Sequence, residues 1–309
     1  MSYVLRRLLG LVPTLFIIVT LAFLMVRLAP GGPFDQEQTL PPEVKANLDR
    51  AYGLDEPLPV QYLHYLRSLA HGDFGPSMRL RDFGVNQLLA TGLPVSLALG
   101  GLALALALAG GIGAGLAAAL SPGRPLDRAL MAFVALGVAV PPYVTAPVLA
   151  LVFGVYLHWL PVAGWRPGEL RDLVLPVVAL ALPTLAYVAR LTRASVLEVV
   201  ALPYVRTARA KGLPERQVIL RHVLPPALAP VLAYVGPAAA GILAGSLVVE
   251  TVFGLPGMGR FLVEGALNRD YTLVMGKVVV YALLVLALNL LIDLTQALID
   301  PRVRHGRRA

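Results

Sequence analysis

Leu93 to Leu120 reads L-P-V-S-L-A-L-G-G-L-A-L-A-L-A-L-A-G-G-I-G-A-G-L-A-A-A-L and carries no charged side chain over its 28 residues. A helix needs about 20 apolar residues to cross the hydrocarbon core of a bilayer, so this stretch can span it with room for tilt. Because lipid offers no partners to backbone polar groups, such a segment must be helical. The chain is therefore predicted to be an all-α integral membrane protein.

The composition of the whole chain supports this fold class. Of 309 residues, 57% are hydrophobic and 14% are charged, whereas a soluble domain carries about 25% charged residues. The net charge of +8 does not indicate nucleic-acid binding, because the basic residues stand at the ends of apolar runs and do not alternate with aromatic ones. The absence of cysteine excludes disulfides, thiol nucleophiles and thiolate metal sites.

Further apolar runs on both sides of this stretch predict six transmembrane helices in a single domain, residues 1–309. The first run exceeds the apolar core of a signal peptide and lacks a small-x-small cleavage site, so we expect it to be a retained span. It ends near Arg27, which can extend its charge to the membrane interface. The predicted spans are residues 8–29, 93–120, 130–157, 173–190, 227–249 and 278–298.

The distribution of basic residues predicts the orientation in the membrane. Six spans place both termini on one side. The segments on that side (1–7, 121–128, 190–228 and 302–309) hold 15 Lys/Arg against three acidic residues, and Asp300 at the edge brings the net charge to about +11. The opposite segments hold ten Lys/Arg against 13 acidic residues. The positive-inside rule therefore predicts cytoplasmic N and C termini.

Three connecting segments follow from this topology. Residues 30–92 form a sizeable extracytoplasmic loop after the first helix, with two short helices expected around 42–52 and 60–70, each preceded by prolines. Residues 250–277 form a second extracytoplasmic loop. Residues 191–226 form a cytoplasmic loop.

The glycine run from Gly110 to Gly115 resembles a dinucleotide fingerprint only superficially. No strand precedes it, and its third glycine is misplaced for G-x-G-x-x-G. Gly111 and Gly115 are four residues apart, which places both on one face of a helix. They therefore predict close packing against a neighbouring helix.

The chain lacks the motifs of enzymes and of metal or nucleotide sites. It has no G-x-x-x-x-G-K-[ST], no H-E-x-x-H and no G-x-S-x-G, and its five histidines are scattered without ligand spacing. We therefore expect no catalytic residue, no metal and no cofactor bound by this chain. Asn289 and Asp293 form a polar face in the last span. A hydrogen bond to a neighbouring helix is the favoured role of this face, and a proton or cation relay is the alternative.

The cytoplasmic loop contains a short, sharply bounded helix. Pro203 begins it, and Gly212-Leu213-Pro214 ends the stretch Y-V-R-T-A-R-A-K, since Gly212 suits a left-handed cap and Pro214 cannot continue a helix. Eight residues are too few to form a stable helix alone in water. The spans hold one side of it, and either a cytoplasmic partner or anionic lipid headgroups contact the other. Composition alone leaves these two open.

The spacing beyond this helix resembles the EAA loop of ABC importer permeases, E-A-A-x3-G-x9-I-x-L-P. Nine residues separate Gly212 from H-V-L-P at 222–225. The positions that match are Ala208, Gly212, Leu224 and Pro225, and those that depart are Arg206, Thr207 and His222. The departures are similar to the B-type permeases of the dipeptide/oligopeptide/nickel transport family, which show Y-V-R-T-A-R-A-K-G-L there. The resemblance runs nearly end to end and includes Y-G-L-D-E-P-L-P-V-Q-Y, E-T-V-F-G-L-P-G-M-G and the closing D-P-R-V-R.

This resemblance implies a coupling helix that sits in a groove of a cytoplasmic ATPase. Two ATP-binding subunits would bind ATP and Mg²⁺, a second homologous permease would complete the pore, and an extracytoplasmic substrate-binding protein would deliver short peptides. The chain would be a multi-pass protein of a bacterial or archaeal inner membrane. The implied coupling residues are Tyr204, Arg206, Thr207, Ala208, Arg209, Ala210, Lys211, Gly212 and Leu213, with Leu224 and Pro225 supporting the motif.

Other functions remain open from the sequence. The same machinery could import nickel or another small solute, because no residue points to peptide. A stand-alone secondary transporter would work without partners, driven by a proton gradient and sensitive to Asp293→Asn. A membrane scaffold or enzyme would show no transport at all.

Overall fold

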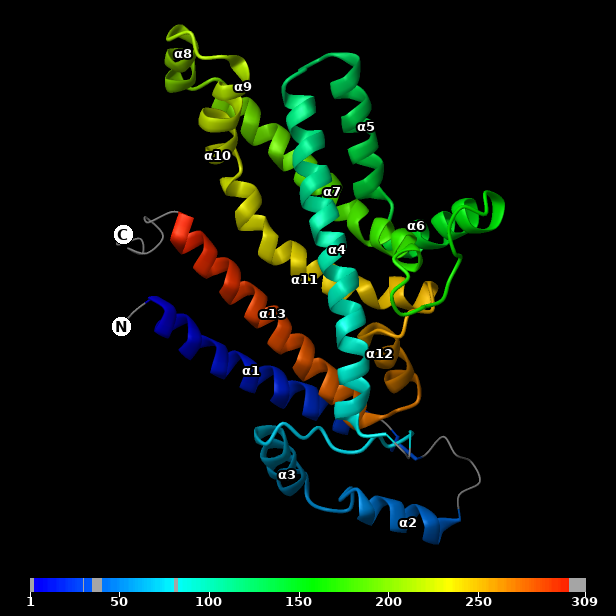
Figure 1. Cartoon of the computed structure of the whole chain (residues 1–309). Coiled ribbons are helices and arrows are strands. Elements are labelled where there is room, and N and C mark those ends of the chain that lie inside the picture. The colour runs from blue at the N-terminus through cyan, green and yellow to red at the C-terminus, as the bar shows by residue number, and fades with distance from the viewer. Residues whose placement is uncertain (1–2, 30, 35–40, 81–82, 300–309) are drawn as a thin grey trace. The chain divides into compact units, whose positions relative to one another are not determined.

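The structure is a computed structural model that describes residues 3–29, 31–34, 41–80 and 83–299 (Figure 1). Over these residues the chain is helical, and its only β pairing is an isolated bridge between Pro76 and Gly84. The predicted all-α class is therefore confirmed.

Within the described ranges, five helices are long and apolar enough to cross a membrane. A sixth span is present only if α5 (Pro125–Ala139) and the helix that follows it count as one. The structure thus supports five or six spans, and the side on which the termini lie stays a prediction. The five helices are α1 (Tyr3–Leu28), α4 (Val85–Ala119), α7 (Arg171–Val200), α11 (Ala229–Val252) and α13 (Tyr271–Ile299).

Residues 130–157 were predicted to form one span. In the structure they belong to two helical segments that are joined by a bend. After α5 the chain turns by 109° into α6 (Pro142–Leu149), which continues as the π-helix η1 (Ala150–Tyr156). Val140 adopts an extended backbone (φ −98°, ψ 114°), because Pro141 disfavours the helical conformation of the residue before it. The proline pair Pro141–Pro142 therefore breaks the helix at this point.

The chain forms two compact units. The first comprises Met1–Val95 and Pro256–Leu286. It holds α2 (Pro42–Ala51) and α3 (Leu58–Ala70), which confirm the two short helices predicted in residues 30–92, and α12 (Met258–Leu267). Its apolar core includes Val85 and Met258, both fully buried.

A buried carboxylate ties the first unit together before α13. Asp270 accepts hydrogen bonds from Ser77 Oγ, from Met78 N at 3.2 Å and from Leu273 N at 3.1 Å. The bond to Leu273 caps the first turn of α13. The other two bonds hold the segment at Ser77 and Met78, which lies almost 200 residues earlier in the sequence.

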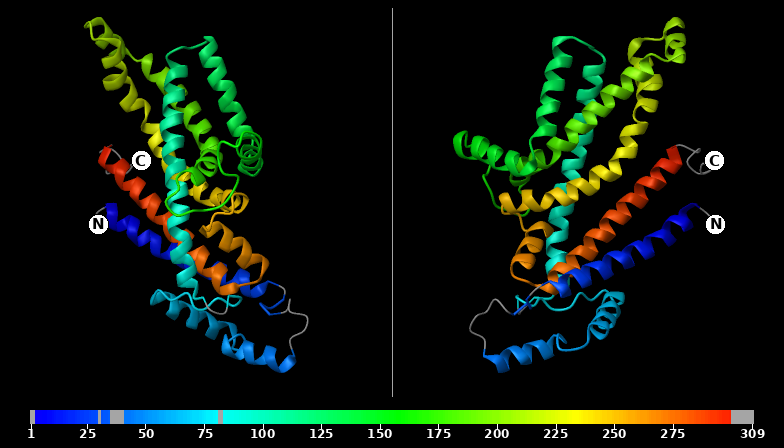
Figure 2. Two further views of the ribbon diagram at one scale, coloured as in Figure 1. Left: turned by 45° about the vertical axis from the view of Figure 1, so that its right-hand side comes forward. Right: turned by 180° about the vertical axis from the view of Figure 1, so that it is seen from behind.

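The second unit comprises Ser96–Leu255 and Ala287–Ala309. In it α4 packs closely on α7, because a Cβ at Gly111 would lie 2.7 Å from Val188 Cβ and one at Gly115 would lie 2.4 Å from Ala189 O. Only glycine allows this approach, so the predicted close packing of Gly111 and Gly115 is confirmed. Figure 2 shows α8 (Pro203–Ala210) beyond the end of α7, where the chain turns back toward α11.

Candidate functional site

The short helix α8 has the bounds that its sequence predicts. It begins at Pro203, after Leu202 in an extended conformation (φ −70°, ψ 147°). It ends before Gly212, whose φ of +79° lies in the left-handed region. No atom would lie within 4 Å of a Cβ at Gly212, so the backbone conformation, and not a lack of space, favours glycine there.

One face of α8 is anchored in an apolar core of the second unit. Val205 is fully buried and Ala208 is 7% exposed, and their spacing of three residues puts them on the same face. Leu213 packs against the same core. Its other buried members are Ala119, Val196, Val199, Val218, Val223 and Ala227, contributed by α4, α7 and the segments after α8. The chain itself therefore supplies the contacts on one side of α8.

The segment after α8 returns through three short elements. These are α9 (Glu215–Val218), the π-helix η2 (Ile219–Val223) and α10 (Leu224–Ala227). Pro226 has no N–H to donate to the carbonyl of His222 four residues earlier. The Tyr204 hydroxyl donates to that carbonyl at 3.2 Å. Tyr204 therefore ties α8 to the returning segment.

The other face of α8 is open and basic. Among the predicted coupling residues, Tyr204 is 44% exposed. Arg206, Thr207, Arg209, Ala210, Lys211 and Gly212 are also exposed. Of the two motif-supporting residues, Leu224 is half-buried and Pro225 is exposed.

An ion pair bridges the turn that follows α8. Arg209 donates to Glu215 from Nη2 at 2.6 Å and from Nε at 3.1 Å. These hydrogen bonds lower the pKa of the Glu215 carboxyl below its ordinary value. The Arg209–Glu215 pair bridges the turn at Gly212. Arg206 and Lys211 form no ion pair with any described residue.

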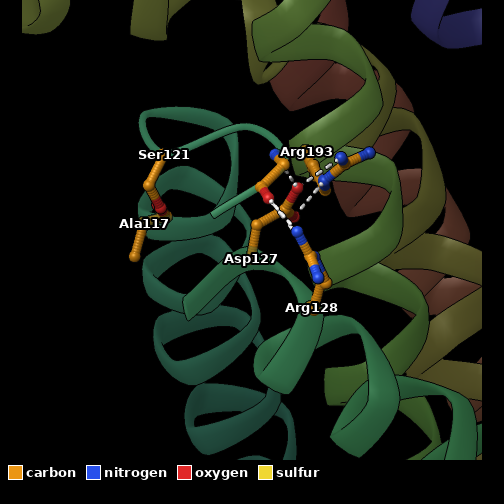
Figure 3. A network of polar contacts seen from close by, with 6 residues as sticks. Ala117, Ser121, Asp127, Arg128 and Arg193 are labelled. Carbon is orange, nitrogen blue, oxygen red and sulfur yellow. Dashed lines mark hydrogen bonds and ion pairs between the residues drawn. The ribbon is translucent and has the colours of Figure 1, made fainter. Parts of the chain in front are cut away.

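A second polar contact fixes α7 near the end that leads to α8 (Figure 3). Arg193 donates to Asp127 from Nε at 2.7 Å and from Nη2 at 2.8 Å, and Gly123 N donates to the same carboxylate at 2.9 Å. Arg128 donates to the Gly123 carbonyl at 3.0 Å. The start of α5 is thus tied to α7 about three turns before α8. Sequence reasoning missed this contact, because the paired residues are 66 positions apart and no motif joins them.

The polar face of the last span is only partly described. A Cβ at Gly236 of α11 would lie 3.0 Å from Asn289 Oδ1, so the two helices approach closely at this amide. The side chain of Asp293 lies outside the described part of the structure. Its predicted role therefore stays open.

Residues 111–305 match the family described as binding-protein-dependent transport system inner membrane component. Residues 1–78 match the N-terminal part of such a membrane component. The chain belongs to this family. It is therefore a multi-pass component of a transport system in the inner membrane and not an enzyme, and the predicted resemblance to ABC importer permeases is confirmed.

Two relatives match this chain over nearly its whole length. The chain is 50% identical over 305 residues to the oligopeptide transport system permease protein OppB of Escherichia coli strain K12, and the match covers 99% of this chain and 100% of the relative. It is 40% identical over 306 residues to the dipeptide transport system permease protein DppB of Bacillus subtilis strain 168, covering 99% of both.

Two solved structures share the fold of this permease. One shows inward-facing conformations of the MetNI methionine ABC transporter, with a TM-score of 0.59 and 18% identity over 69% of this chain and 97% of that chain. The other is an amino acid ABC transporter with histidines, with a TM-score of 0.53 and 20% identity over 68% and 93%. At these identities the likeness concerns the fold alone.

Proposed function

We propose that this chain is one permease subunit of an ATP-driven importer of short peptides and forms half of the translocation pore. The observation that carries this proposal is the end-to-end likeness, at 50% and 40% identity, to permeases named for oligopeptide and dipeptide transport. Both names refer to peptides, which favours peptides over nickel or another small solute. The same likeness favours an ABC importer over a stand-alone secondary transporter.

The exposed face of α8 is the proposed contact with a cytoplasmic ATP-binding subunit. Three features support it: the buried anchor of Val205 and Ala208, the basic open face with Arg206 and Lys211, and the sharp cap at Gly212. A helix held on one face and exposed on the other can pass a displacement to α7. The proposal places ATP and Mg²⁺ in two such subunits and none in this chain.

The remaining partners follow from the same proposal. A second, homologous permease completes the pore, and an extracytoplasmic binding protein delivers the peptide to the outer segments. Cytoplasmic termini, supported by the charge asymmetry of the loops, place α8 on the side of the ATP-binding subunits.

Uptake by the reconstituted system tests this function. The chain is copurified from its native membrane with its partners, placed in proteoliposomes with the binding protein, and supplied with a labelled tripeptide. We expect uptake that requires ATP and that the chain alone does not support. Uptake of nickel without peptide, or uptake by the chain alone under a pH gradient, would contradict the proposal.

A further inference from the structure

The first unit contains two adjoining cavities outside the predicted coupling site. Their volumes are about 410 Å³ and about 400 Å³, and Arg27 and Gln61 line both. The larger one, here called the outer cavity, is also lined by Arg50, Glu56, His64, Tyr65 and Asp73. Its volume lies in the range of small-ligand sites, about 300–1,000 Å³.

We propose that the outer cavity binds a short zwitterionic peptide, with its carboxylate on Arg27 and Tyr65 and its ammonium toward Glu56 and Asp73. This inference rests on the proposed function, because it assigns a binding site for the peptide to the permease itself.

Arg27 provides an unneutralised cation. Its guanidinium carbon lies 5.6 Å from the ring centroids of both Phe23 and Tyr271. Its Nε is buried and has no hydrogen-bond partner, and no described residue forms an ion pair with this side chain. The side chain as a whole is half-buried, and a guanidinium that loses part of its water is normally paired with an anion. The aromatic rings hold the planar group in place and leave its donors for an incoming carboxylate.

Tyr65 provides a neutral donor to the same cavity. Its hydroxyl is buried without a hydrogen-bond partner, and its ring stacks on Phe23 at 5.9 Å. Burial and the neighbouring Tyr62 raise the pKa of Tyr65 to about 12, so it keeps its proton at neutral pH. The Tyr62 hydroxyl is engaged with Thr20 and does not line the cavity.

Acceptors line the same cavity. Gln61 donates its amide N–H groups to the carbonyls of Leu54 and Glu56, and its Oε1 is buried without a partner. Glu56 Oε2 lies 3.1 Å from His64 Nδ1 but accepts no hydrogen bond. Asp73 adds a second carboxylate. These oxygens suit an ammonium group.

The mixture of charges decides between ligand classes. A phosphate would satisfy Arg27, but Glu56 and Asp73 would repel it. A simple cation would be repelled by Arg27 and Arg50. A ligand that carries one carboxylate and one ammonium satisfies both groups, and a short peptide is such a ligand.

Binding to the full chain tests the proposal. The purified permease is placed in phosphatidylcholine nanodiscs without its partners and titrated with alanyl-alanine by calorimetry. We expect Arg27→Gln and Tyr65→Phe each to weaken binding at least about tenfold, since each removes one hydrogen-bonding group from the carboxylate. The same peptide with an N-terminal acetyl or a C-terminal amide should also bind at least about tenfold more weakly.

Matched variants separate this effect from misfolding. Tyr62→Phe removes a hydroxyl from α3, the helix that carries Tyr65, and Arg67→Gln removes an exposed charge from the same helix. Neither residue lines the outer cavity. Both should bind the dipeptide as the wild type does. Wild-type permease that binds no dipeptide would overturn the proposal. So would Arg27→Gln and Tyr65→Phe variants that bind it unchanged, or capped peptides that bind equally well.

Uptake by the complete importer distinguishes this proposal from the proposed function. Peptide uptake with the same KM in the wild type and in Arg27→Gln would overturn the cavity site and leave the function intact. A complete importer that moves no peptide would contradict the function, whereas selective dipeptide binding to the chain would still support the site.

Discussion

The turn at Gly212 gives the sharpest test of the coupling role, through the substitution Gly212→Val. At φ +79°, a residue other than glycine costs about 1–3 kcal/mol, and a β-branched one belongs at the upper end of that range. Because no atom would lie within 4 Å of a Cβ at this position, packing adds nothing to the cost. The strain alone therefore shifts the turn away from its native conformation by a factor of about 5 to 150.

ATP-dependent peptide uptake by the reconstituted importer is the assay. If α8 must keep its geometry to follow the ATP-binding subunit, uptake should fall by a factor within that range while membrane insertion stays normal. Gly212→Asn should retain most of the activity, because asparagine tolerates the left-handed region.

Gly168→Val is the matched control. Gly168 has φ +91° and equally open surroundings, but it lies outside the α8 segment. The same backbone strain there should leave uptake near the wild-type rate. Wild-type uptake by Gly212→Val would refute the coupling role of this turn. An equal loss in both variants would show that the effect is general destabilisation.

Three further predictions concern stability and pH. Gly115→Val should lower the melting temperature in detergent by the equivalent of about 1–3 kcal/mol, because its Cβ would meet Ala189 O at 2.4 Å, whereas Gly113→Val, with no atom within 4 Å, should stay close to wild type. Asp270→Ala should cost about 0.5–2 kcal/mol for the lost cap alone, measured in the same way; an unchanged melting temperature would contradict the role of this carboxylate. Because Arg209 lowers the pKa of Glu215 below 4.5, the pair contributes fully above that pH and is lost only as pH falls through the lowered pKa. The stability difference between wild type and Glu215→Gln should therefore be constant from pH 5 to 8.

Several parts of this fold could be predicted because they depend on local chemistry. Runs without charge identify the membrane-crossing helices, since burying a charge in lipid is costly. Pro203 and Gly212 mark the ends of α8, because each restricts its own backbone. Gly111 and Gly115 indicate close packing, since their spacing alone puts them on one helix face.

Other parts depend on contacts between distant residues and could not be predicted. The prolines at 141–142 indicate a kink, but the 109° turn between α5 and α6 is not encoded in two residues. The aromatic contacts of Arg27 come from Phe23, one turn away, and from Tyr271, far along the chain, so its sequence surroundings do not indicate them. A span-end arginine and a binding arginine look identical in sequence.

The contacts around α8 link this short helix to two longer helices, α7 and α5. Val205 and Ala208 join α8 to the end of α7 through a shared core, and Arg193 joins α7 to the start of α5 through Asp127. If α8 is the coupling helix, these contacts would connect a displacement of its exposed face to both α7 and α5. In the proposed coupling role, the exposed arginines would contact the ATP-binding subunit, and the buried apolar residues would transmit its movement.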